Sequence, residues 1–418
     1  MTADTEGNLY ALLRSQFPAD RSRPCLLLPD GGQISYGALE QGVGRIAAWL
    51  KSQGVQPGDR VAFQAPKTPE AMMLYLATLQ VGAVTLPLNT AYTEAEVGYF
   101  LGNAEPRLFV RDAVAIAAQA SAFAPLHDIE PRAGDDLAAL IYTSGTTGRS
   151  KGAMISHGNL ADNALALRQA WAFTADDVLL HALPIFHIHG LFVALHNVLL
   201  TGASMVWLAR FDDEQIIEGL KRSTVLMGVP TFYTRLLAHP KFTRELAAPM
   251  RLFISGSAPL LASTFEEFEQ RTGQRILERY GMSEALMITS NPLHGARIAG
   301  SVGYPLPGVA LRIGGGETTG VIEIKGPSVF SGYWRMPEKT AEEFTADGYF
   351  ITGDVGRQDA DGRVWISGRA KDVIISGGFN VYPKEIELVL DQLPGVVESA
   401  VIGCPHPDFG EAVVAVIA

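Results

Sequence analysis

Short apolar runs alternate with helical patterns along most of this chain, and this alternation limits the folds available to it. Candidate strands at 60–64, 178–181, 225–229 and 252–254 are each followed by a segment with helical periodicity or a helix-opening proline. Repeated strand–helix units of this length predict parallel sheets covered by helices on both faces. In such sheets, ligands bind beyond the carboxyl ends of the strands.

The pattern changes near Val309, where short strands with turn signals replace the helices as far as Arg369. A helix at 383–390 and strands at 396–402 and 413–418 follow. We therefore expect an α/β protein with two domains. Residues 1–370 form a large multi-subdomain domain with two helix-flanked mixed or parallel sheets and a small β subdomain, and residues 371–418 form part of a small α+β domain. The Ala/Pro-rich stretch 113–136 is predicted to be a linking segment.

Charge and cysteine content narrow the classes of partner. The formal net charge is -11 and the sequence pI is about 5.3, which disfavours nucleic acid and anionic membranes as partners. The two cysteines, Cys25 and Cys404, have no metal-like spacing, as expected in a reducing compartment. No basic leader or spanning apolar run is present, so we expect a cytoplasmic protein; its oligomeric state is left open.

A loop at 142–152 follows a buried apolar run at 137–141 and has the composition of a phosphate-binding loop. Its glycines allow backbone N–H groups to converge on an anion, its hydroxyls add donors and Lys151 adds a positive charge. Gly148 lies three residues before the lysine, so the spacing is not that of a Walker loop. A flexible Gly/Ser/Thr surface loop is the alternative. The candidate nucleotide-binding residues here are Thr143, Ser144, Gly145, Thr146, Thr147, Gly148 and Lys151.

Three later segments also carry chemistry. His187 and His189 lie at a strand-to-helix junction, where they form either a zinc pair or a structural pair. The segment 255–259 follows a buried strand, so its backbone can approach a flat ligand closely. Asp354 ends a strand, where its carboxylate can accept both hydroxyls of a ribose.

These motifs, in this order from Tyr142 to Pro383, resemble the AMP-forming adenylating enzymes, the superfamily of acyl-CoA synthetases, luciferases and peptide-synthetase adenylation domains. The resemblance implies ATP, Mg²⁺ and coenzyme A as cofactor and co-substrates. It implies that Tyr280 stacks on the adenine, that Ser283 bonds a phosphate and that Glu284 holds Mg²⁺, for which one carboxylate plus phosphate oxygens is adequate. The other implied nucleotide-binding residues are Ser257, Ala258, Pro259, Glu278, Arg279, Gly281, Met282, Asp354 and Arg369.

The resemblance implies the remaining roles as well. Lys151, Ser283, Glu284 and His187 are the expected catalytic residues. Lys371 is the expected hinge between the two domains. The expected acyl-binding residues are His187, His189, Arg279 and Met282, and the expected coenzyme A-binding residues are Gly377, Gly378 and Phe379.

The segment 276–303 resembles malonyl-CoA synthetases in particular. The planar guanidinium of Arg279, next to Tyr280, can bind a second carboxylate through two parallel hydrogen bonds. The sequence thus predicts an acid–thiol ligase that activates malonate, and methylmalonate as a second acid, to an acyl-adenylate and then to the acyl-CoA. Arg279 in a structural salt bridge is the alternative, with Arg297 as the second candidate for the substrate carboxylate.

Three other functions are consistent with the sequence. The chain could activate another small acid, or it could adenylate an amino acid, although no Asp lies beside His187 to bind an α-amino group. It could also be a nucleotide-binding module with little turnover. The family's small domain ends in a Lys-bearing segment that is absent before Ala418. We therefore expect an incomplete C-terminal domain that lacks the catalytic lysine, and an impaired first half-reaction.

Overall fold

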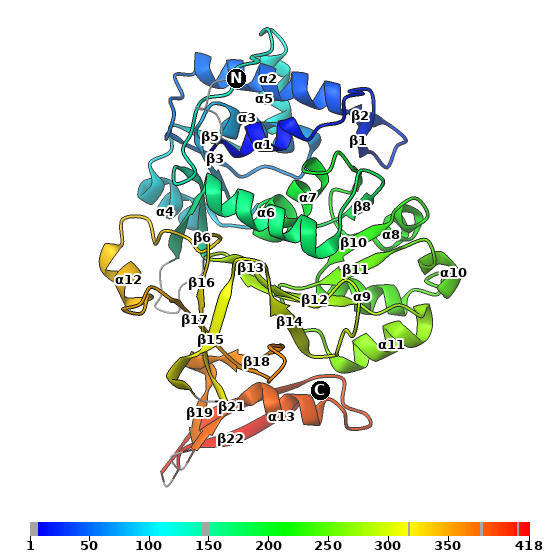
Figure 1. The fold of residues 1–418 in the computed structure, drawn as a ribbon, viewed down its shortest axis with the longest axis vertical. Helices are drawn as coiled ribbons and strands as arrows, with labels where there is room; N and C mark the ends of the chain where they lie inside the picture. The colour runs from blue at the N-terminus through cyan, green and yellow to red at the C-terminus, as the bar shows by residue number, and fades with distance from the viewer. Residues whose placement is uncertain (1–6, 144–149, 317, 377–378, 408) are drawn as a thin grey trace.

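The computed structural model describes residues 7–143, 150–316, 318–376, 379–407 and 409–418. The predicted loop residues Ser144 to Gly148, and Gly377 and Gly378, lie outside the described residues. The described residues form three sheets, of which the four-stranded one lies at the lower end of the long axis (Figure 1). They confirm the predicted α/β class, with one difference in how the β subdomain is attached.

A five-stranded sheet forms the N-terminal end, in the order β5 (Leu108–Val110), β3 (Arg60–Phe63), β4 (Val84–Pro87), β6 (Leu137–Thr143) and β7 (Lys151–Ser156). The first four strands are parallel, whereas β6 and β7 are antiparallel, with Thr143 opposite Lys151. The predicted loop was therefore too long at its end. Lys151 and Gly152 already pair with Thr143 and Tyr142 of β6, so these four residues belong to strands.

The central sheet has thirteen strands within the described residues and changes character along its length. Its parallel part carries the helices, and its antiparallel part contains the predicted β subdomain. The antiparallel pairing of β14 with β18 joins this subdomain edge to edge with the rest, so it is not a separate sheet. In sheet order the strands are β15 (Ala310–Ile313), β16 (Thr319–Lys325), β17 (Phe350–Gln358), β18 (Val364–Arg369), β14 (Ser301–Pro305), β13 (Leu286–Ser290), β12 (Leu277–Met282), β11 (Leu252–Ser255), β10 (Val225–Gly228), β8 (Val178–His181), β9 (Ser204–Trp207), β1 (Pro24–Leu27) and β2 (Gln33–Ser35).

Local signals explain most helix starts. The Ser35 side chain caps α2, Pro69 occupies the first turn of α3, and Thr93 with Glu96 forms a capping box before α4. The linker prediction for 113–136 was wrong at its start, because α5 (Ala113–Ala120) begins there under an Asp112 cap. Alanine favours helix strongly but gives no apolar periodicity to detect. The other helices are α1 (Leu9–Ser15), α2 (Tyr36–Ser52), α3 (Pro69–Gln80), α4 (Glu94–Ala104), α6 (His157–Trp171), α7 (Leu195–Leu199), α8 (Asp213–Leu220), α9 (Pro230–Ala238), α10 (Arg244–Ala247), α11 (Ala262–Thr272) and α12 (Pro337–Glu342).

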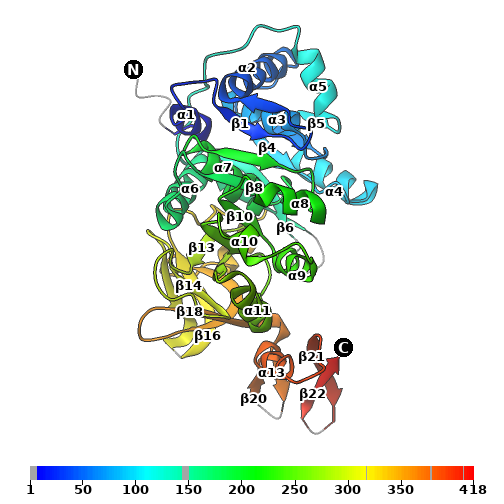
Figure 2. The ribbon, with the colours of Figure 1, turned by 90° about the vertical axis from the view of Figure 1, so that its right-hand side faces the viewer.

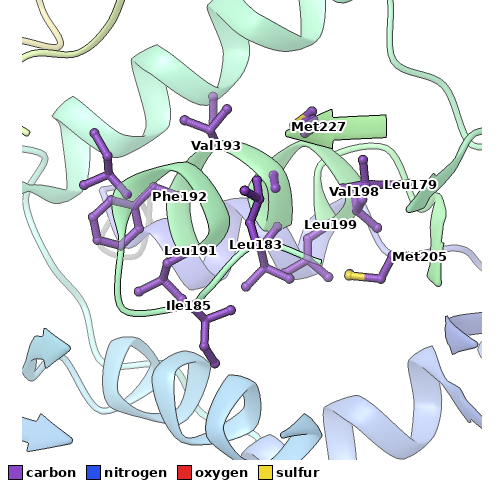
Figure 3. Packing of buried hydrophobic residues seen from close by; sticks show 14 of the residues in the cluster. Leu179, Leu183, Ile185, Leu191, Phe192, Val193, Val198, Leu199, Met205 and Met227 are labelled. Atoms are coloured by element: carbon purple, nitrogen blue, oxygen red, sulfur yellow. The ribbon is translucent and has the colours of Figure 1, made fainter. Parts of the chain in front are cut away.

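A buried π-helix, η2 (His189–Ala194), runs directly into α7 at the centre of the core. All six of its residues are buried. Figure 3 shows Leu191 beside Ile185, and Leu179 of β8 beside Val198 of α7. Such single-turn widenings of a helix occur often at functional sites.

Residues after Lys371 form a four-stranded sheet and one helix below the central sheet (Figure 2). The elements are β19 (Ile374–Ser376), β20 (Phe379–Val381), α13 (Pro383–Leu390), β21 (Ser399–His406) and β22 (Gly410–Ile417). The predicted helix is confirmed, and both predicted strands are present with shifted ends. No described helix combines the length and apolar character that a bilayer span requires.

Asp177 joins three elements at the start of the parallel strands. It is 3% exposed, and its carboxylate accepts hydrogen bonds from Nε and Nη2 of Arg251 at 2.6 and 2.7 Å and from the Thr224 hydroxyl at 2.8 Å. Burial by itself raises the pKa of Asp177. The hydrogen bonds from Arg251, the Thr174 amide and Thr224 outweigh it, so the pKa lies below its ordinary value.

We expect Asp177→Asn to lower the free energy of unfolding by about 3 kcal/mol at pH 7, because it leaves the Arg251 charge without its partner. A depressed carboxylate pKa contributes stability that is present above the ordinary pKa and is lost as pH falls through the folded-state pKa. The difference between wild type and variant should therefore shrink below about pH 4. Urea unfolding across pH measures it, with the exposed neighbour Asp176→Asn as control. An equal difference at pH 3 and pH 7 would contradict this account.

Candidate active site

A cavity of about 650 Å³ lies between the central sheet and residues 371–418. Its lining brings together three of the predicted segments, namely the loop after β11, the strand β12, and the facing ends of β17 and β18. Lys371, the predicted hinge, also lines it, as do Lys384 and Glu387 of α13, which sequence reasoning missed. The predicted nucleotide-binding residues in the lining are Ser257, Ala258, Pro259, Glu278, Arg279, Tyr280, Gly281, Asp354 and Arg369.

The two predicted ribose-binding residues pair with each other. Asp354 and Arg369 are opposite in the antiparallel pair β17–β18, and Arg369 Nε lies 2.8 Å from Asp354 Oδ1. The Tyr280 hydroxyl donates to Asp354 Oδ2 at 2.5 Å. Burial raises the pKa of Asp354, while Arg369 and Tyr280 lower it. A ring face and a carboxylate are thus fixed side by side, as recognition of a nucleoside requires.

A second cluster lies at the end of the β6–β7 pair where Thr143 is opposite Lys151. Glu284 is 6% exposed, and its Oε1 accepts from the Thr143 hydroxyl at 3.1 Å and from the Tyr333 hydroxyl at 3.2 Å. The Lys151 ammonium lies 3.1 Å from Glu343 Oε1 and 4.1 Å from the centre of the Tyr333 ring. The structure therefore brings the predicted Thr143, Lys151 and Glu284 together. The sequence could not predict that Tyr333 and Glu343 join this cluster, because neither residue lies in a segment with a chemical motif.

The residues at this cluster fit Mg²⁺ only in company with phosphate oxygens. The described residues contain no group of three His, Cys, Asp or Glu side chains suited to a metal. Glu284 supplies one carboxylate, and Mg²⁺ on a polyphosphate commonly uses one or two protein carboxylates. The same finding removes the zinc-pair alternative for His187 and His189 within the described part of the chain. Ser283 lies in the turn after β12, beside Glu284.

Arg279 carries a buried positive charge without an anionic partner. It is 3% exposed, and its Nε and Nη2 atoms have no hydrogen-bond partner among the described residues. Gly256 makes room for it, since a Cβ atom there would stand 2.5 Å from the guanidinium carbon. The structural salt-bridge alternative is therefore wrong for the described structure. Other buried polar atoms that have no hydrogen-bond partner in the described part of the chain include Ser255 Oγ, His189 Nε2 and Glu278 Oε2.

The two histidines of the predicted acyl site are held in their neutral form. Burial lowers the pKa of His187 to about 4, with a further contribution from Arg279, and burial and Arg279 also lower the pKa of His189. His187 Nδ1 accepts from the His189 amide at 3.2 Å, and His189 Nδ1 lies 3.3 Å from the Ser257 hydroxyl. Ser257 has a φ of 70°, a strained value for a residue with a side chain. The wall next to Arg279 is thus polar and uncharged.

The remaining predicted residues are more peripheral. Met282 ends β12 and packs against the core, and Phe379 is 76% exposed on β20. Arg297, the second candidate for the substrate carboxylate, donates to the carbonyls of Pro292, Arg275 and Leu293 at 3.2, 2.6 and 2.9 Å. Because its guanidinium already has these acceptors, Arg297 braces a loop.

Comparison with known proteins supports the same family. The model of the AMP-binding enzyme family matches residues 13–334. The chain belongs to this family. The malonate–CoA ligase of Arabidopsis thaliana is 35% identical to this AMP-binding enzyme over 481 residues, covering 98% of the chain and 79% of the relative. The resemblance predicted from the sequence is confirmed.

Two further relatives indicate the range of this AMP-binding family. The crystal structure of ATP-bound MatB from Rhodopseudomonas palustris superposes with a TM-score of 0.94 at 52% identity, over 98% of this chain and 88% of that one. A feruloyl-CoA synthase from Amycolatopsis sp is 35% identical over 413 residues, which cover 93% of this chain and 84% of the relative. Fold and family are therefore secure, while the relatives differ in the acid they are named for.

Glu278 makes the free energy of unfolding depend on pH. Burial raises its pKa to about 7, and the Leu260 amide, which donates to Oε1 at 3.2 Å, lowers it slightly. A carboxylate with a raised pKa contributes stability that is present below its ordinary pKa and is lost as pH rises through the folded-state pKa.

We expect wild type to lose up to about 3 kcal/mol of unfolding free energy between pH 4.5 and pH 8 relative to Glu278→Gln, which is uncharged throughout. Chemical denaturation at several pH values measures this, with the exposed Glu266→Gln on α11 as control. Parallel pH profiles for wild type and Glu278→Gln would mean that Glu278 is not held protonated.

Proposed function

We propose that this enzyme is an AMP-forming acid–CoA ligase whose substrate is a small dicarboxylate, with malonate as the first choice and methylmalonate as the second. The observation that carries the choice of acid is the buried Arg279 guanidinium without a counter-ion. Two relatives support the same reading, since one is named a malonate–CoA ligase and the other is MatB.

The argument rests on the cost of an unpaired charge. Removing a guanidinium from water costs several kcal/mol, which only an anionic partner with good geometry offsets. A substrate with a second carboxylate supplies that partner and can accept two parallel N–H bonds. An alkyl chain leaves Nε and Nη2 of Arg279 and Nε2 of His189 without hydrogen bonds, which favours the dicarboxylate.

The same charge argues against the amino-acid alternative. An amino acid would place its ammonium group near Arg279, and the two imidazoles whose pKa Arg279 lowers, those of His187 and His189, are neutral. Among the described residues of the cavity, no carboxylate is paired with Arg279. Repulsion between two cations in a buried site is costly, so a ligand with two negative groups is favoured.

The chemistry needs no covalent nucleophile from the protein. One substrate carboxylate attacks the α-phosphorus of ATP, the bond to pyrophosphate breaks, and a thiol then displaces AMP from the acyl-adenylate. Tyr280 and Asp354 hold the nucleoside, Arg279 fixes the far carboxylate, and Thr143 and Lys151 offset charge that develops on the phosphates. Glu284 would hold Mg²⁺, which neutralises charge on the leaving pyrophosphate.

We expect malonate to be preferred over acetate, propionate and octanoate, and Arg279→Met to erase that preference. A site built to bind a polar group rejects analogues that lack it by up to about 10⁴-fold. Competition assays of pyrophosphate release with this panel of acids and ferulate measure the ranking. The matched control is Arg297→Met, which should keep it. If Arg279→Met retains the wild-type order of acids, the dicarboxylate assignment is wrong. If wild type releases no pyrophosphate with any acid, the chain is a nucleotide-binding module.

We also expect Lys151→Ala and Glu284→Gln to lower the rate of adenylate formation more than the affinity for ATP, because charge develops on the phosphates in the transition state. Losing one positioned charge costs about 10²-fold in rate. Calorimetric titration with ATP, together with single-turnover adenylate formation, separates the two effects. Equal losses in rate and affinity would mean that both residues only bind the ground state.

A further inference from the structure

Tyr333 lies between two oppositely charged side chains, those of Lys151 and Glu284. We call these residues, together with Thr143 and Glu343, the phosphate corner. The Tyr333 hydroxyl donates to Glu284 Oε1 at 3.2 Å, and the Lys151 ammonium lies over the Tyr333 ring, 4.1 Å from the centre. Tyr333 itself is 3% exposed. No ion pair joins Lys151 to Glu284 among the described residues, although both are buried and both contact the same aromatic side chain.

The backbone around Tyr333 ties it to both partners. The Phe330 amide donates to the Glu284 carbonyl at 2.7 Å, and the Trp334 amide donates to the Gly152 carbonyl at 2.8 Å. Residue 333 forms an isolated antiparallel bridge with Ala153 of β7. The Phe330 ring meets the Tyr333 ring edge-on, with centroids 4.9 Å apart. Backbone hydrogen bonds before and after Tyr333, together with the Phe330 ring, therefore fix the Tyr333 ring in position.

A buried ammonium and a buried carboxylate attract each other strongly, because little solvent screens them. Without an obstacle they would pair directly, and each would then be unavailable to a ligand. An aromatic ring accepts a cation on its face, and a phenolic hydroxyl donates to a carboxylate at its edge. A tyrosine can therefore satisfy both charges while it keeps them apart, which neither phenylalanine nor leucine can do.

We propose that Tyr333 is a positioning residue that separates Lys151 from Glu284 and holds both ready for the phosphates of a metal-bound nucleotide. The assignment of the phosphate corner rests on the proposed function, whereas the spacer role rests on these contacts alone. Lys151 also forms an ion pair with Glu343, whose Oε1 atom lies 3.2 Å from Lys339 Nζ as well. Because two lysines share this carboxylate, Lys151 can leave it for an anion of higher charge.

Two substitutions separate the functions of the ring and of the hydroxyl. Tyr333→Phe keeps the ring under Lys151 and removes the donor to Glu284. Tyr333→Leu removes the ring as well and allows the ion pair to form. The matched controls are Tyr349→Phe and Tyr349→Leu. The Tyr349 ring also has a cation over its face, since the Arg312 guanidinium lies 3.9 Å from the ring centre, and Tyr349 lies outside the cavity lining.

The test is calorimetric titration with ATP in the presence of Mg²⁺ and, separately, of EDTA, so it needs no knowledge of the acid substrate. We expect Tyr333→Phe to weaken Mg·ATP about tenfold, as for loss of a hydrogen bond to a charged group, and to leave metal-free ATP nearly unchanged. Tyr333→Leu should weaken both forms, because Lys151 is then neutralised by Glu284. The Tyr349 variants should bind as wild type.

Other results overturn the proposal. Wild-type affinity of folded Tyr333→Phe for Mg·ATP, or an equal loss with Mg²⁺ and with EDTA, would make Tyr333 an ordinary packing residue. Tyr333→Phe retains the ring and its packing, so it decides the question even if Tyr333→Leu does not fold. Failure of malonate as a substrate would leave these nucleotide titrations unaffected, so the two proposals fail independently.

Discussion

Hydrogen bonding across the central sheet determines where the charged groups of the site lie. The parallel strands β10 and β11 are followed in the sheet by β12, and β12 begins the antiparallel series that includes β18 and β17. Arg279 and Tyr280 are consecutive on β12, while Asp354 and Arg369 face each other across β17 and β18. Pairing across one sheet thus sets the spacing between the groups proposed to bind the acid and the nucleoside.

The site places several cationic side chains beside acidic ones in a protein whose net charge is negative. Arg279, Lys151, Arg369 and Lys371 all belong to the site, although acidic residues exceed basic ones over the whole sequence. Long-range attraction of an anionic substrate by the protein as a whole is therefore weak. Local donors must supply the affinity, and Arg279 and Lys151 are the most effective of them because they are buried.

Sequence reasoning succeeded where the chemistry is carried by local patterns. The capping box at Thr93, the proline that opens α3 and the motif at 279–284 each lie within a few residues of the structure they specify. It failed at α5, where an alanine run gives no periodicity, and at β7, whose pairing with β6 depends on the register across the hairpin. Tyr333 and Glu343 could not be found at all, because their role comes only from contacts with distant residues.

Gly256 has a consequence that reaches beyond its own position. The guanidinium of Arg279 lies in the wall of the cavity because the backbone at 256 has no side chain to occupy that volume. A methyl group there would displace the charge into the open space, where it would compete with the acid for room. Gly256 therefore fixes where the Arg279 guanidinium can lie, and a side chain at position 256 would move that charge although the arginine itself is unchanged.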